Sequence, residues 1–165
     1  MSVQGSRGSK PSLNKKRFPI LAIDYGEKRF GIAISDSKGI VSTSLGTLSI
    51  SKNIGIGDII EQIRVITTQN RVSSILLGLP QAFEKAYEIN RDRIKRFGQM
   101  ISEATGLEVY YYDESYSSKQ ATAVMIETGK TRTQRRKDVD SVAAALFLQE
   151  YLDGKNSKQL QNRNS

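Results

Sequence analysis

The chain has 165 residues, a formal net charge of +8, and neither cysteine nor histidine. This length suits one domain with a hydrophobic core, and the two missing residue types exclude disulfides, thiolate metal sites and imidazole-dependent nucleophiles. No apolar run approaches the ~20 residues of a membrane span, and the N-terminus lacks the apolar core of a signal peptide.

The positive charge is concentrated in two segments, 1–17 and 128–137, which contain no acidic residue. Together they hold ten of the 25 basic residues, which leaves 15 basic against 17 acidic residues elsewhere. Clustered cations without apolar periodicity indicate contact with a nucleic-acid backbone; a solubilising tail and a solvated loop are the alternative. The basic residues of the second segment are Lys130, Arg132, Arg135, Arg136 and Lys137.

Periodicity and turn residues predict an α/β domain with a mixed five-stranded sheet flanked by helices. We expect a disordered basic arm at 1–17, a folded domain at 18–153 and a disordered polar tail at 154–165. The first three strands should form an antiparallel unit. In chain order, the predicted elements are strands at 20–24, 30–34 and 40–50, a helix from 58, a strand at 72–79, a helix at 81–105, a strand at 107–112, and helices at 117–127 and 138–152.

Asp24 ends an apolar run that shows no polar alternation, as is typical of a central strand covered on both faces. A carboxylate there is costly unless a cation, hydrogen bonds or a metal compensates it. Asp24 could instead bond backbone amides in the turn near Gly26.

Other acidic residues also follow or begin apolar elements. Asp113 and Glu114 end the fifth predicted strand, and Asp140 lies in the first turn of the last helix, on its apolar face. If the first and fifth strands were parallel neighbours, their carboxyl ends would meet at one sheet edge, together with Asp140. Each residue also has a structural alternative: Asp113 could bond turn amides, Glu114 could lie on the surface, and Asp140 could complement the helix dipole.

Several carboxylates in one place favour a cation between them. Hard oxygen ligands select Mg²⁺ or Mn²⁺. A pair of such ions about 4 Å apart activates water and stabilises the leaving oxygen in phosphodiester cleavage, without histidine or cysteine. The acids therefore predict a divalent-metal nuclease site.

Four motifs, IDYGEKRFGIAISD (23–36), LLGLP (76–80), DESYSS (113–118) and KDVDSVAAA (137–145), resemble the YqgF (RuvX) family of pre-16S rRNA nucleases. That family is also described as similar to Holliday-junction resolvases, and the match runs from about residue 18 to 153. The resemblance implies an RNase H-like fold, a cytoplasmic location, divalent-metal chemistry and a part in 5′-end processing of 16S rRNA during ribosome biogenesis.

Residue by residue, the resemblance implies that Asp24, Glu114 and Asp140 are catalytic and hold the metal. The clustering of acids at the end of the fifth strand adds Asp113 as a further metal ligand. Lys28 and Arg29 match the family's basic pair, and with the 130–137 loop they would hold the nucleic-acid backbone. Ser115 stands where the family usually has arginine, so one phosphate or orienting contact is missing. Residues 81–88 replace a loop that usually carries asparagine, aspartate and glycine.

Three other functions stay open from the sequence. A resolvase acting on branched DNA shares the chemistry, and dimerisation would distinguish it because resolvases act as symmetric homodimers. A non-catalytic RNA-binding module would keep the fold, and Ser115 favours it. A phosphate-binding fold of the actin and sugar-kinase type would need a second glycine-rich motif and a much longer chain.

Overall fold

The computed structural model describes residues 17–79, 87–113 and 141–154. The predicted arm except its last residue, the helix at 117–127, the basic loop and most of the polar tail lie outside these residues. The predicted mixed five-stranded sheet is confirmed, with the order β3-β2-β1-β4-β5. Its strands are β1 (Ile20–Tyr25), β2 (Arg29–Ser35), β3 (Ser42–Ser49), β4 (Ser74–Leu79) and β5 (Glu108–Asp113).

The first three strands form the expected antiparallel unit, and β1, β4 and β5 run parallel to one another. The condition that the first and fifth strands are parallel neighbours is met only in part, because they run parallel but β4 lies between them. Two interstrand spacings separate β1 from β5 by about 10 Å. Because all three strands run the same way, their carboxyl ends still meet at one edge of the sheet.

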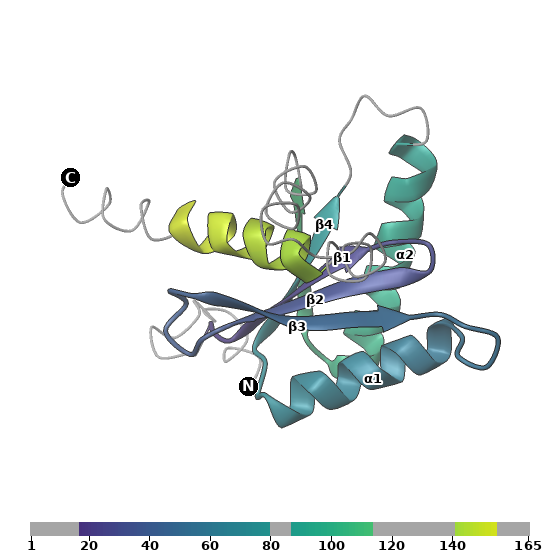
Figure 1. Ribbon diagram of the computed structural model, residues 1–165, viewed down its shortest axis with the longest axis horizontal. Helices are drawn as coiled ribbons and strands as arrows, with labels where there is room; N and C mark the ends of the chain where they lie inside the picture. Colours follow the sequence, from purple (N-terminus) through teal and green to yellow (C-terminus); the bar gives the residue numbers. More distant parts are fainter. Residues whose placement is uncertain (1–16, 80–86, 114–140, 155–165) are drawn as a thin grey trace, which may run out of the picture.

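In the described part of the chain, helices cover both faces of the sheet (Figure 1). The helices α1 (Ile56–Gln69) and α2 (Tyr87–Thr105) pack on one face, and the helix formed by residues 141–154 packs on the other. In the described parts of the chain, no helix combines the length and apolar character needed to cross a membrane.

The larger core lies between the sheet and the helices α1 and α2. The apolar positions that predicted these helices are buried in it, including Ile59 and Ile63 of α1 and Phe97 and Ile101 of α2. Gly106 ends α2 with a φ of +72°, a conformation that glycine adopts without steric cost. The helical spacing therefore identified the inward faces correctly.

The smaller core lies under the helix of residues 141–154. Ala144, Phe147 and Leu148 are fully buried against the sheet, where they meet Ala22 of β1 and Ala33 of β2. This confirms the apolar face predicted for the last helix. The described helix continues through Gly154, two residues beyond its predicted end and into the segment expected to be tail.

Two element boundaries differ from the prediction because side chains occupy backbone groups. Helix α1 begins at Ile56 rather than Asp58, since the Asp58 carboxylate accepts a 2.8 Å hydrogen bond from the Gly55 amide. Strand β3 begins at Ser42 rather than residue 40. The Asp36 carboxylate accepts hydrogen bonds from the amides of residues 40 and 41, which turns this segment away from the sheet.

Candidate active site

Asp24 lies on the central strand of the sheet, near the end at which the parallel strands β1, β4 and β5 terminate. It is the fifth residue of β1, the central strand, and only 8% of its surface is exposed. Side chains alternate along a strand, so Asp24 shares a face with Ile20 and Ala22, which contact the helix of residues 141–154. The prediction of a carboxylate at the end of a buried central strand is confirmed.

The residues beside Asp24 in the sheet are glycines. Gly31 of β2 is its register partner. On the other side, the last β1–β4 pair joins Ile23 to Leu77, so the next residue of β4, Gly78, lies beside Asp24. Both glycines are buried, and β5 continues the row with Tyr112 opposite Gly78. Neither adjacent strand therefore places a side chain beside Asp24. Glycine inside a strand often marks a close approach of a ligand or another backbone.

The helix of residues 141–154 covers the face on which Asp24 lies. Ser141, the first described residue of this helix, is 3% exposed. The helix is joined to the β2–β3 connection by Gln149, whose amide accepts from the Ser42 amide at 3.0 Å and donates to the Ile40 carbonyl at 2.8 Å. The Ser42 hydroxyl also donates to the Ala145 carbonyl at 2.6 Å. These bonds hold the helix over the sheet.

The turn after β1 carries the predicted basic pair. Lys28 and Arg29 are both exposed. The turn needs Gly26, because a Cβ there would lie 2.5 Å from the Arg29 carbonyl oxygen. The next residue, Glu27, forms a 3.4 Å ion pair with Arg93 of α2. The turn and the beginning of α2 are therefore adjacent at this edge of the sheet.

Tyr25, next to Asp24 in sequence, lies on the opposite face of the sheet. Its ring makes edge contacts with Phe30 and Phe97, at centroid distances of 5.3 and 5.1 Å. Burial raises the pKa of the Tyr25 hydroxyl, Arg93 partly lowers it, and Glu27 adds to the rise. Tyr25 therefore stays neutral at physiological pH and anchors the strand that carries Asp24.

The other predicted site residues are described less fully. Asp113 is the last residue of β5, paired in register with Leu79, which confirms that it stands at the same sheet edge as Asp24. Glu114, Asp140 and the basic residues of the 130–137 loop lie outside the described residues. Within the described ranges no three acidic side chains form a group that could hold a metal ion. Ser115 and the loop at 80–86 also lie outside them.

Sequence reasoning missed two features of this edge. The glycine pair was detectable in principle, because Gly31 and Gly78 each interrupt an apolar strand. The contact between Glu27 and Arg93 was not, because 66 residues separate the partners and only tertiary packing brings them together.

Comparison with known proteins identifies the family. The sequence model described as "RuvX: Holliday junction resolvase" matches residues 19–154. Two curated relatives are named "Putative pre-16S rRNA nuclease". The protein of Lactococcus lactis subsp. lactis (strain IL1403) is 33% identical over 135 residues, which cover 81% of this chain and 93% of that protein. The protein of Lactobacillus johnsonii is 35% identical over 137 residues, with 81% and 94% covered.

Among solved structures, RuvC from Thermus thermophilus in complex with a Holliday junction substrate is similar, with a TM-score of 0.53. It is 17% identical, and the match covers 84% of this chain and 95% of that one. A second T. thermophilus RuvC structure also has a TM-score of 0.53, with 14% identity. These similarities confirm the RNase H-like fold. With the buried aspartate, the basic turn and a family match over residues 19–154, they show that the chain belongs to the RuvX family.

Proposed function

We propose that this chain is a divalent-metal-dependent nuclease that hydrolyses phosphodiester bonds and processes the 5′ end of pre-16S rRNA in the cytoplasm. The observation that carries the proposal is Asp24: a carboxylate 8% exposed on the central strand, between two glycines, at the edge where parallel strands end. Clefts of open α/β sheets form at such edges. The family membership and the names of the curated relatives support the same activity.

The proposed metal ligands are Asp24, Glu114 and Asp140, with Asp113 as an additional acid. Tyr112 of β5 pairs with Gly78 and stacks on Phe147 of the helix that covers the Asp24 face, so β5 reaches that face two residues before Glu114 in the sequence. The burial of Ser141 supports a role for Asp140, its neighbour in the sequence.

These carboxylates fit Mg²⁺ or Mn²⁺, because hard cations prefer oxygen ligands. When bound, such ions activate a water molecule and stabilise the leaving oxygen of a phosphodiester. The protein's own part is to hold the acids rigidly and to bind the substrate. Asp24 is fixed by a strand whose first five residues are all buried. The exposed cations Lys28 and Arg29 and the basic loop would bind phosphates.

Holliday-junction resolution is the second candidate, because the family model carries that description. A resolvase has to cut two strands symmetrically, so this function requires a homodimer with two active sites. The nuclease chemistry would be the same, and the oligomeric state and the preferred substrate would differ.

The test uses a labelled 16S precursor leader and a labelled four-way DNA junction, each with Mn²⁺, with EDTA, and with the variant Asp24→Asn. We expect Mn²⁺-dependent cutting of the RNA that EDTA and Asp24→Asn both abolish. Asp36→Asn is the matched control, since it makes the same chemical change at an exposed residue just after β2, at the opposite edge of the sheet. It should keep full activity at neutral pH.

If the chain is a dimer and cuts the four-way DNA junction in preference to the RNA, the proposed function changes from pre-rRNA processing to Holliday-junction resolution. If neither substrate is cut while salt-sensitive RNA binding persists, the nuclease proposal fails and the chain is an RNA-binding module.

A further inference from the structure

The first half of α2 carries positive charge that the sequence motifs did not indicate. Residues 91–96 contain four basic side chains and one acidic one, a net charge of 4 − 1 = +3. Helix α1, which packs on the same face of the sheet, contains one basic and two acidic residues, a net charge of 1 − 2 = −1. Of these two helices, only α2 has such a concentration of cations, and it is confined to residues 91–96.

Helix stability does not explain this placement. Cations stabilise the C-terminal end of a helix, yet the last turn of α2 has no basic residue. Asp92 stands four residues before Arg96, a spacing that permits an ion pair. Nevertheless, within the described part of the chain, Lys95 and Arg96 are exposed and make no ion pair. Their charges are available to an external anion.

The cations of α2 lie next to the candidate active site. The guanidinium of Arg93 is 3.4 Å from the Glu27 carboxylate, and Glu27 precedes the basic pair in the turn that follows β1. Lys95 and Arg96 follow Arg93 within about 4.5 Å along the helix axis. A polyanion that crosses the turn from the Asp24 face would reach these cations next.

We propose that Arg93, Lys95 and Arg96, here called the α2 ridge, bind the phosphodiester backbone of the substrate beyond the cleavage site. The inference rests on the proposed nuclease function and extends it, because it adds a second phosphate contact region on the face of the sheet opposite Asp24. Arginine suits this role because its planar fork matches phosphate oxygens, and lysine adds a point charge.

The test measures binding of the labelled 16S precursor leader by the full-length chain in EDTA, over a series of salt concentrations. Each phosphate contact to a nucleic acid adds about 0.7 to 0.9 to the slope of log K against log salt. The double variant Lys95→Gln/Arg96→Gln should therefore lower the slope by about 1.5 and weaken binding on the order of tenfold at 0.1 M salt.

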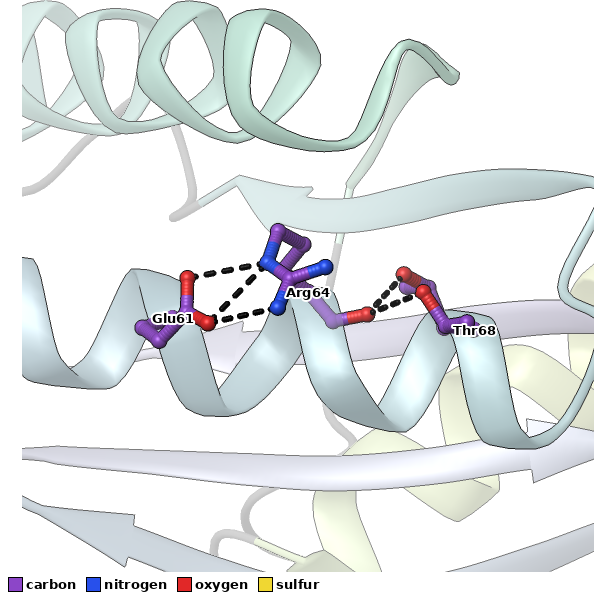
Figure 2. Close-up of polar contacts among 4 residues, drawn as sticks. Glu61, Arg64 and Thr68 are labelled. Carbon is purple, nitrogen blue, oxygen red and sulfur yellow. Dashed lines mark hydrogen bonds and ion pairs between the residues drawn. The ribbon is translucent and has the colours of Figure 1, made fainter.

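Arg64→Gln is the matched control. The Arg64 side chain is 43% exposed on α1, and its guanidinium is paired with Glu61, with a shortest distance of 2.6 Å (Figure 2). This variant makes the same kind of substitution but removes one charge where the double variant removes two, and it should leave the salt slope unaltered. Glu27→Gln tests the opposite direction, since it removes the acid that pairs with Arg93. It should tighten RNA binding several-fold at low salt.

An unaltered salt slope in the double variant, with its unfolding temperature unchanged, would overturn the inference and leave the ridge as a solvated face or a site for an acidic protein. An equal loss in Arg64→Gln would also overturn it, because the effect would then be one of net charge. Cleavage by the wild-type chain is measured separately. If the wild type cuts the RNA and the double variant binds it unchanged, only the role of the α2 ridge is refuted. If the double variant binds more weakly but the wild type does not cut, only the nuclease function is refuted.

Discussion

Replacing Gly26 by alanine tests whether the turn after Asp24 is as tight as the structure indicates. The added Cβ would lie 2.5 Å from the Arg29 carbonyl oxygen, whereas carbon and oxygen normally approach to about 3.3 Å. One side of the turn must therefore move by about 0.8 Å. Because the obstructing atom belongs to the backbone, no side-chain rotation can relieve the contact.

Two effects of opposite sign decide the result for Gly26→Ala. Forced overpacking costs about 1 to 3 kcal/mol, and the reduced freedom of the unfolded chain returns about 0.4 to 1 kcal/mol. We expect a net loss of about 1 to 2 kcal/mol, or about 2 to 8 °C in unfolding temperature for a chain of this size. Circular dichroism measures it, because the chain has no tryptophan.

Gly57→Ala is the matched control with the opposite expected sign. Gly57 is exposed in the first turn of α1, and a Cβ there would meet nothing within 4 Å. Alanine is the better helix former by up to about 1 kcal/mol, so this variant should unfold at a higher temperature. If Gly26→Ala were as stable as the wild type, the steric reasoning would be refuted.

Gly26→Ala should reduce the rate of RNA cleavage by more than the loss of folded protein alone would explain. The turn connects Asp24 to Lys28 and Arg29, and a misplacement of about 1 Å can cost up to 100-fold in rate. Cleavage of the precursor leader, measured well below the unfolding temperature, separates this effect from unfolding. A fall in stability without a fall in rate would show that the turn does not position the site.

Two further predictions concern the smaller core and the response to acid. Phe147→Ala should destabilise the protein by about 3 to 5 kcal/mol, because the ring is fully buried against the sheet; a thermal shift below about 5 °C would contradict this. For Asp36, hydrogen bonds from the amides of Ile40 and Val41 lower the pKa below its ordinary 3.8. The ionised Asp36 carboxylate therefore contributes to the stability of the fold above that value, and this contribution is lost as pH falls through the folded pKa. Between pH values of about 4.5 and 2.5, the unfolding temperature of Asp36→Asn should fall less than that of the wild type. Equal falls in the two proteins would disprove the prediction.

Local patterns predicted most elements because they depend on residues close together in the chain. The apolar run before Asp24 indicated a covered strand, and the spacing of Ile59, Ile63 and Ile66 indicated the inward face of α1. Boundaries were less accurate where a side chain bonds the backbone, as Asp36 and Asp58 do. The clustered acids predicted the metal chemistry and the family resemblance indicated the substrate, neither of which periodicity alone specifies.

By itself, the sequence determined the α/β class, the antiparallel first three strands, the buried aspartate and the apolar face of the last helix. Only the tertiary structure decided that β4 lies between β1 and β5, that Gly31 and Gly78 flank Asp24, and that Arg93 meets Glu27. The physical reason is that periodicity reports which face of an element is buried, not which element covers it. Strand order and contacts between distant residues depend on how all the elements share one core, and this is a property of the folded chain as a whole.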